Sequence, residues 1–340
     1  MTAWNKGGQR HRRDLFQFCA AAFLASGAAA TWPIAARAQQ PAKVFRIGIL
    51  SPAGSPSTNA VDALREGLRE LGYIDGQNIT FEYRLATGDI NRLPAMAGEL
   101  VRLPVDVIVI DGGGNVAQIA HDATPTIPIV GPIGPDPVAA GLAASFTRPG
   151  GNITGFAGFG VELSGKRLQF LREAFPGISH IAALWSPADP VSNRRATAEA
   201  ARTLGVQLRT IDVATPDEIP AGFEAAAAGG AEELVFLPNA MFWNHRTRIV
   251  ALAAQYRMPG IYPEREYADD GGLLAYGPSI ADLFRRTATY IDKILRGARP
   301  GDLPIQQPTK FDLIVNLKTA RTLGVTFPPS ILARADEVIE

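Results

Sequence analysis

Short apolar runs alternate with longer amphipathic segments from residue 44 to beyond residue 290, which predicts strands followed by helices. The run Ile47–Leu50 is β-branched and apolar and ends at Ser51-Pro52, as a strand before a turn does. Residues 58–71 then carry apolar side chains at helical spacing and end at Gly72, a common helix terminator. The chain therefore begins with a strand, a turn and a helix.

The same order of elements occurs twice, with an offset of about 130 residues. Ile181–Leu184 followed by Ser186-Pro187 repeats the opening strand and turn. Alternating strands and helices are typical of parallel sheets with right-handed crossovers. The pattern predicts an α/β protein with two doubly wound parallel-sheet lobes. The expected strands lie at 47–50, 79–83, 107–110 and after 128, and at 181–184, 207–211, 234–237 and after 259.

The end of the chain departs from a simple repeat. A long helix at about 279–296 and a strand at 311–316 follow the second unit, and we expect the chain to return there to the first lobe. Glycine-containing stretches between the units suit hinge strands, although turns explain them equally well. The ligand cleft is expected between the lobes. The predicted parts are 44–157 plus about 278–327 for lobe one, 158–277 for lobe two, and hinge strands near 155–160, 272–278 and 303–310.

The first 38 residues have the features of a cleaved export signal. Arg12-Arg13 precede an apolar stretch from Leu15 to about Ala30, and Ala36-Arg37-Ala38 forms an A-x-A cleavage site. The arginine pair resembles a twin-arginine signal, so both this route and the general secretory route stay open. A transmembrane anchor is the alternative. We predict cleavage after Ala38 and a periplasmic protein.

Composition and charge narrow the class of protein. Hydrophobic residues make up 46% and charged residues 19%, as in a globular α/β protein. Residues 1–38 hold five basic residues and one acidic residue, so their removal changes the net charge from 0 to −4. An acidic chain lacks the basic surface that binds nucleic acid. The only cysteine, Cys19, lies in the signal, so the mature chain has neither a disulfide nor a thiol nucleophile.

Open parallel sheets bind ligands beyond the carboxyl ends of their strands, so the loops there supply the candidate residues. In the first lobe, hydroxyl groups and helix amides suit an anion such as a carboxylate, and glycines allow close approach. A carboxylate held between Pro135 and Pro137 suits a ligand ammonium group, or caps a helix near Val138. The candidates in lobe one are Ser51, Ser57, Thr58, Gly113, Asn115 and Asp136.

Aromatic residues gather at the strand ends of the second lobe. Such side chains hold an organic solute by stacking, or belong to the core. An amide beside them adds hydrogen-bonding capacity. The candidates in lobe two are Trp185, Asn239, Tyr262 and Tyr276.

Signals for catalysis, metals and cofactors are absent from the sequence. His121, His180 and His245 are far apart and lack metal-ligand spacing. Gly112 to Ala117 matches a dinucleotide fingerprint formally, but it follows the third strand instead of the first. No nucleophile elbow or phosphate-binding loop is present. We therefore predict a binding protein without cofactor or metal, and not an enzyme.

Several stretches resemble the ABC-transporter substrate-binding proteins of the tryptophan/tyrosine type. Arg148-Pro149-Gly150-Gly151-Asn152-Ile153-Thr154-Gly155 is the most specific of them. The similarity covers essentially all of residues 44–327. The other stretches are Arg46–Ser51, Gly67–Tyr73, Gly76–Ile79, Asp136–Val138 with Gly141-Leu142, and Phe311–Ala320.

This resemblance implies a type I periplasmic-binding fold that captures a small organic solute, such as an amino acid, in the interlobe cleft. It also implies delivery to a membrane permease with a cytoplasmic ATPase, by a protein that we expect to be a monomer. By position, Ser51, Ser57, Asp136 and Asn239 match places that line the cleft in the family. Members usually have a hydroxyl residue after the glycines of the third loop, where this chain has Gly114-Asn115. A ligand-sensing receptor or an enzyme on the same scaffold are the alternatives.

Overall fold

The structure is a computed structural model that describes residues 43–340 except 54–57, 88, 159 and 188–190. The predicted export signal and Ser57 therefore lie outside the described residues. Within the described part of the chain, no helix combines the length and the apolar character needed to cross a bilayer.

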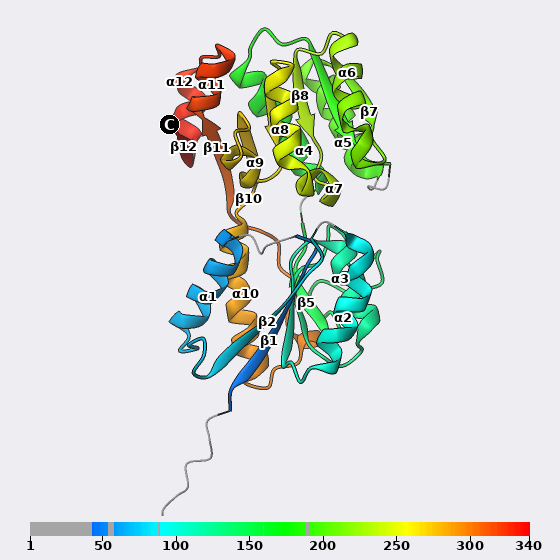
Figure 1. Ribbon diagram of the computed structural model, residues 1–340, viewed down its shortest axis with the longest axis vertical. Helices are drawn as coiled ribbons and strands as arrows, with labels where there is room; N and C mark the ends of the chain where they lie inside the picture. Colours follow the sequence, from blue (N-terminus) through cyan, green and yellow to red (C-terminus); the bar gives the residue numbers. More distant parts are fainter. Residues whose placement is uncertain (1–42, 54–57, 88, 159, 188–190) are drawn as a thin grey trace, which may run out of the picture. The chain divides into compact units, whose positions relative to one another are not determined.

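The first lobe is built on a five-stranded parallel sheet with the order β2-β1-β3-β4-β5. Helices α1 and α10 cover one face, and α2 and α3 cover the other (Figure 1). The strands are β1 (Phe45–Ser51), β2 (Ile79–Leu85), β3 (Val107–Ile110), β4 (Ile129–Pro132) and β5 (Ile153–Phe156). The helices are α1 (Thr58–Glu70), the 3-10 helix η1 (Ile90–Arg92), α2 (Leu93–Arg102), α3 (Gly114–Ala123) and α10 (Ile280–Leu295).

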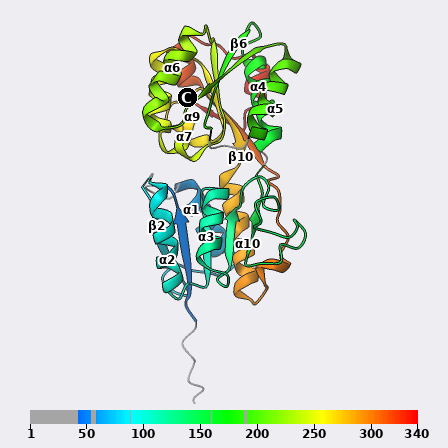
Figure 2. The same ribbon diagram turned by 90° about the vertical axis from the view of Figure 1, so that its right-hand side faces the viewer.

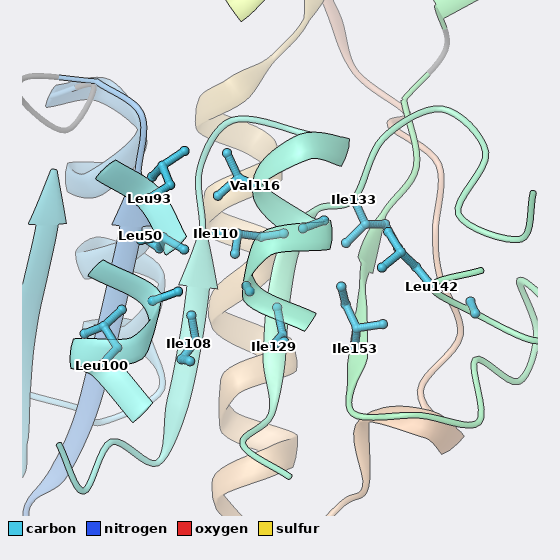
Figure 3. Packing of buried hydrophobic residues seen from close by; sticks show 14 of the residues in the cluster. Leu50, Leu93, Leu100, Ile108, Ile110, Val116, Ile129, Ile133, Leu142 and Ile153 are labelled. Atoms are coloured by element: carbon cyan, nitrogen blue, oxygen red, sulfur yellow. The ribbon is translucent and has the colours of Figure 1, made fainter. Parts of the chain in front are cut away.

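Central strand β3 shows why this sheet needs helices on both sides. All four of its residues are buried, so a continuous β-branched run replaces the alternating pattern of a sheet with one wet face. Its even-numbered side chains, Ile108 and Ile110, join the cluster under α2 and α3 (Figure 3). Val107 and Val109 join the cluster under α1 and α10. The run of apolar residues therefore fixes the layered fold.

The second lobe is built on a seven-stranded sheet with the order β12-β11-β10-β9-β8-β6-β7. Only the β10–β11 pair is antiparallel among the strand pairs of the described residues. The strands are β6 (His180–Trp185), β7 (Gln207–Asp212), β8 (Glu233–Phe236), β9 (Gly260–Tyr262), β10 (Leu274–Pro278), β11 (Phe311–Asn316) and β12 (Glu337–Ile339).

Helices again pack on both faces of this sheet, as Figure 2 shows from the side. Helices α4, α5, α11 and α12 contribute to the core on one face, and α6, α8 and α9 to the core on the other. Their bounds are α4 (Gly160–Ala174), α5 (Val191–Leu204), η2 (Pro216–Glu218), α6 (Ile219–Ala228), α7 (Ala240–Asn244), α8 (Arg246–Gln255), α9 (Arg265–Asp269), α11 (Leu317–Leu323) and α12 (Pro329–Arg334).

Three segments connect the lobes, close to the predicted hinge strands. They follow β5, follow β10, and run from the 3-10 helix η3 (Pro300–Asp302) to β11. Backbone hydrogen bonds join them: Ala157 N donates to Gln306 O at 2.9 Å, and Ser279 N donates to Lys310 O at 3.0 Å. The three segments are therefore hydrogen-bonded to one another where they pass from one lobe to the other.

The predicted boundary of the first lobe is wrong at its C-terminal end. Only residues up to about 303 return to the first lobe, where α10 packs against α1 and Thr154 Oγ1 donates to Leu303 O at 2.8 Å. The strand at 311–316 is β11, which pairs with β10 in the second sheet. An antiparallel partner needs only a chain reversal, and the excursion through α10 supplies it. The helix expected near Val138 is also absent, since residues 137–141 form a turn.

Candidate functional site

The first sheet reverses its winding between β1 and β3, because α1 and α2 lie on opposite faces. Loops diverge at such a switch point and leave room for a ligand. Ser51 ends β1 there and is fully buried, and Asp111 follows β3 directly. The Ser51 hydroxyl donates to Asp111 Oδ2 at 3.1 Å. A fixed, partly buried carboxylate therefore marks the centre of this edge.

Asp111 titrates unusually close to neutrality. Burial raises its pKa to about 6, against the opposing effect of the Ser51 hydrogen bond, and the charge of Glu266 in the second lobe adds to the rise. In the described part of the chain, no group donates to the other carboxylate oxygen, Oδ1. Asp111 is therefore mostly ionised at neutral pH, with one oxygen held and one oxygen open to a new partner.

The other candidates of lobe one occupy different positions. Gly113 caps α3 with φ 77°, a left-handed conformation that favours glycine, and Asn115 is exposed in the first turn of that helix. Thr58 begins α1, but its side chain is not among those described. Asp136 is exposed and uses Oδ1 to accept from Ala139 N at 2.9 Å, which caps the turn at 137–141.

The second sheet has its own switch point between β6 and β8. Trp185 ends β6 and is 4% exposed, and the Arg194 guanidinium lies 4.9 Å from its ring centroid. Its Nε1 has no hydrogen-bond partner among the described residues. Asn239 follows β8 and caps α7 by accepting from Met241 N at 2.7 Å. Trp185 and Asn239 thus lie at the edge where the sequence predicted them.

The two tyrosine candidates belong to packed aromatic groups. Tyr262 is 1% exposed and stacks on Tyr267 with a centroid distance of 4.8 Å. Tyr276 packs against Phe170 of α4 at 4.7 Å and against Phe311. Both side chains support the strand ends of β9 and β10 from within the cores.

A charged group lies at the same edge and was not predicted. Arg167 of α4 is 1% exposed, and its Nε donates to Tyr276 O at 2.8 Å. Burial lowers its pKa to about 10, against the opposing charge of Glu264. Burial also raises the pKa of Glu264 to about 8, although Arg167 favours the carboxylate. Arg167 and Glu264 thus influence each other without a hydrogen bond between them.

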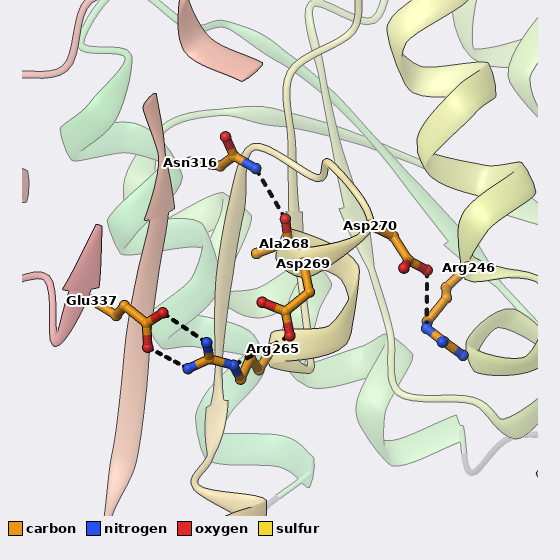
Figure 4. Close-up of polar contacts among 7 residues, drawn as sticks. All are labelled: Arg246, Arg265, Ala268, Asp269, Asp270, Asn316 and Glu337. Carbon is orange, nitrogen blue, oxygen red and sulfur yellow. Dashed lines mark hydrogen bonds and ion pairs between the residues drawn. The ribbon is translucent and has the colours of Figure 1, made fainter. Parts of the chain in front are cut away.

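Helix α9, which follows Glu264, is fastened from both sides (Figure 4). Arg265 forms a bidentate pair with Glu337 of β12, with Nη2 to Oε1 at 2.7 Å. Asn316 Nδ2 donates to Ala268 O at 2.9 Å, and the Arg246 side chain pairs with Asp270 at 3.1 Å. This bracing holds the residues of α9 in fixed orientations at the strand ends.

A cavity of about 340 Å³ adjoins α9 and the start of α10. Residues from both lobes line it, among them Asp62, Glu266, Gly277, Ser279 and Asp312. No cluster that could ligate a metal ion occurs among the residues that the structure describes. Polar and apolar residues both line the cavity, and its volume is in the range of small-molecule sites.

Sequence analysis missed Asp111, Arg167 and Glu264 for different reasons. Asp111 could have been predicted as a site residue, because it directly follows the third strand at the predicted switch point. Arg167 lies in an amphipathic helix, where an arginine normally faces solvent. Its counter-charge Glu264 is far away in the sequence, so nothing local indicated that either side chain is buried.

Two doubly wound lobes with polar groups at the carboxyl edges of their sheets have the architecture of two-lobed solute-binding proteins. Within that class the chain belongs to the family of ABC transporter substrate binding proteins, whose pattern matches residues 46–339. This membership confirms the resemblance seen in the sequence. It also confirms that the chain is a binding protein and not an enzyme.

Individual relatives agree with this assignment. The chain is 25% identical over 288 residues to a tyrosine-binding protein of Clostridioides difficile, covering 83% of this chain and 82% of that one. A conserved domain protein of Vibrio cholerae is 26% identical with a TM-score of 0.77, covering 87% and 100% of the two chains. An ABC domain of Streptococcus pneumoniae, solved with L-Trp, is 24% identical with the same TM-score and coverage. These folds confirm the predicted architecture.

Proposed function

We propose that this protein is exported and captures an amino acid with an aromatic side chain for an ABC importer. The observation that carries the proposal is the pair of switch points, each with polar groups whose hydrogen bonds are incomplete. The names of the relatives supply the ligand class, since one is a tyrosine-binding protein and another was solved with L-Trp. Ionisable side chains at the strand ends, Asp111 in lobe one and Arg167 and Glu264 in lobe two, suit a solute that carries charge.

The solute binds between the carboxyl edges, and the lobes close on it about the three crossing segments. Ser51, Gly113 and Asn115 contribute from lobe one, together with Ser57 and Thr58. Trp185 and Asn239 contribute from lobe two, with Tyr276 behind them. The exposed Asp136 lies at the rim, where a carboxylate attracts a cationic group.

Export and delivery follow from the same proposal. Residues 1–38 direct the chain out of the cytoplasm and are removed after Ala38, and the mature monomer meets the permease subunits at the membrane. The intact mass of protein recovered from the periplasm checks this cleavage, and a mass that still includes residues 1–38 contradicts it.

Isothermal titration of the mature protein with L-Trp and L-Tyr tests the ligand class. We expect saturable binding of at least one of them, with a negative heat-capacity change from burial of the ring. L-Ala and a pentose serve as controls that lack the ring or the amino-acid head group. Tight binding of the pentose with no response to either aromatic amino acid refutes the proposal.

A further inference from the structure

Three buried polar groups converge at the carboxyl ends of β9 and β10 in the second lobe. Arg167 Nη1, Glu264 Oε2 and the Tyr267 hydroxyl each lack a hydrogen-bond partner among the described residues. Arg167 and Tyr267 are 1% and 0% exposed, so water reaches neither side chain from bulk. Leaving such groups unpaired is costly, and native proteins rarely do so without a reason.

The three groups lie close enough to act on one another. The charge of Arg167 favours the ionised form of Glu264, and the pKa of Tyr267 is raised by burial and then by the charge of Glu264. No hydrogen bond within the described residues joins any two of them. One guest with complementary groups can therefore complete all three at once.

We propose that Arg167, Tyr267 and Glu264 form the subsite for the head group of an α-amino acid. Arg167 Nη1 and the Tyr267 hydroxyl donate to the α-carboxylate, and Glu264 Oε2 accepts from the α-ammonium group. Arg167 repels a simple amine, and a simple anion leaves Glu264 protonated with Oε2 unpaired, so only a zwitterion pairs with Arg167 and with the ionised form of Glu264. This inference rests on the proposed function and adds the residues that select the head group.

The subsite lies next to the wall of the cavity beside α9, and α9 is held rigidly. Gly277 lines the cavity beside α9, and a Cβ built on it would lie 3.8 Å from Arg167 Nη2. That Cβ would also lie 1.9 Å from Pro263 O, so a side chain at this position would collide with the strand end that leads to Glu264. The bidentate Arg265–Glu337 pair holds α9, and with it Tyr267, in place before a ligand arrives (Figure 4).

Ligand binding at the subsite should be coupled to loss of a proton from Glu264, which can be measured. The pKa of Glu264 is about 8 in the free protein, so the group is mostly protonated at pH 7. The groups that face it are Arg167 of α4, Arg246 of α8, and Glu266 and Tyr267 of α9. An ammonium partner favours the carboxylate and lowers this pKa. Binding at pH 7 therefore releases a proton, and affinity rises from pH 6.5 to pH 8.5.

Tyr267→Phe separates binding from folding. Because its hydroxyl has no partner in the free protein, removing it should leave the melting temperature unchanged or higher. Affinity for L-Trp or L-Tyr should fall roughly tenfold, since a hydrogen bond to a carboxylate is lost. Tyr262→Phe is the matched control, because its ring stacks on Tyr267 but its hydroxyl lies toward Gly260. This variant should keep wild-type affinity.

Glu264→Gln tests both the contact with the ligand ammonium group and the release of a proton on binding. Titrations of L-Trp in buffers of different ionisation enthalpy should show proton release for the wild type and much less for Glu264→Gln, which also binds more weakly. Indole-3-propionate, which lacks the ammonium group, should bind wild type and variant with similarly low affinity.

The two hypotheses fail in different ways. If the wild type binds L-Trp or L-Tyr and both Tyr267→Phe and Glu264→Gln bind equally well, the head-group subsite is wrong and the proposed function stands. If the wild type binds a pentose or indole-3-propionate in preference to both amino acids, the subsite and the ligand class are both wrong.

Discussion

At the scale of single residues, adjacent glutamates in the second lobe behave in opposite ways. Glu232 accepts from Ser179 N at 2.7 Å and from His180 N at 2.9 Å, and these bonds lower its pKa. Glu233 is 5% exposed with Oε2 unpaired, and burial raises its pKa to about 8. Glu232 precedes β8 and Glu233 begins it, and their different surroundings give the neighbouring carboxylates different protonation states.

Glu233→Gln should stabilise the protein and Glu232→Gln should destabilise it. The raised pKa of Glu233 contributes stability at acidic pH, where the carboxyl group is protonated in both states. This contribution is lost as pH rises through about 8, so Glu233→Gln increases the free energy of unfolding most above pH 8. Glu232 contributes above its ordinary pKa of 4.5 and loses this contribution as pH falls below it. Urea denaturation at pH 5 and pH 9 measures the effect of Glu233, and a further series below pH 4.5 measures the loss of the Glu232 contribution. Equal shifts for the two variants would contradict this assignment.

Ser51→Ala should raise the pKa of Asp111 above its value of about 6. The hydrogen bond from the Ser51 hydroxyl stabilises the Asp111 carboxylate and lowers its pKa. Without this bond, burial and the charge of Glu266, which both raise the pKa, have a larger effect. A carbon-detected NMR titration of the Asp111 carboxyl group reports the change. An unchanged Asp111 titration would show that the hydrogen bond is not formed in solution.

At the scale of elements, two glycines inside helices have opposite surroundings. A Cβ built on Gly67 of α1 would lie 2.8 Å from Arg285 O of α10, so the two helices approach as closely as their backbones allow. A Cβ built on Gly98 of α2 meets nothing within 4 Å. Gly67 is therefore required by packing, whereas Gly98 lowers helix stability without a packing reason.

Gly67→Ala should destabilise the protein, by about 1–3 kcal/mol for a contact that overfills a helix interface. Gly98→Ala should stabilise it by about 0.4–1 kcal/mol, because alanine restricts the unfolded chain and favours helix. Chemical denaturation followed by circular dichroism measures both. Stabilisation by Gly67→Ala would mean that α1 and α10 separate easily.

Local patterns were sufficient to predict most elements but not their partners. The apolar run at 107–110 and the amphipathic pattern at 279–296 became β3 and α10 within a residue or two. The pattern at 311–316 indicated a strand correctly, but alternation carries no information about which sheet the strand joins. The same limit hid Arg167, whose burial depends on Glu264 and Tyr276. Pairing over long sequence distances decides these features.

At the scale of the whole molecule, Arg286 contacts two of the three connections between the lobes. It lies in the second turn of α10, the helix that follows the second crossing, and its guanidinium is 4.9 Å from the ring of Phe156 at the first crossing. It donates to Thr309 Oγ1 at 3.2 Å and to Gln306 on the third crossing. One side chain therefore ties the first and third crossings to the helix that follows the second.

Arg286→Ala should change the response of the molecule to its ligand. We expect the wild type to become more compact when L-Trp or L-Tyr saturates it, and the variant to compact less and bind several-fold more weakly. Small-angle scattering with and without ligand measures this. Arg285→Ala is the control, since Arg285 pairs with Glu70 inside the first lobe at 2.6 Å. An equal radius of gyration for wild type and Arg286→Ala in both states would contradict the prediction.

The placement of β11 and β12 in the second sheet affects the order in which the chain can fold during translation. The five strands of the first sheet are all synthesised by residue 156, but their face toward α10 stays uncovered until residue 295. The second sheet lacks β11 until residue 316 and β12 until residue 339, and Arg265 lacks its Glu337 partner until residue 337. All residues of the first lobe are synthesised by about residue 303, so the first lobe can finish folding on the ribosome before the second. Loss of a few residues around Glu337 would remove the Arg265–Glu337 pair that holds α9 and would leave β11 as an open sheet edge.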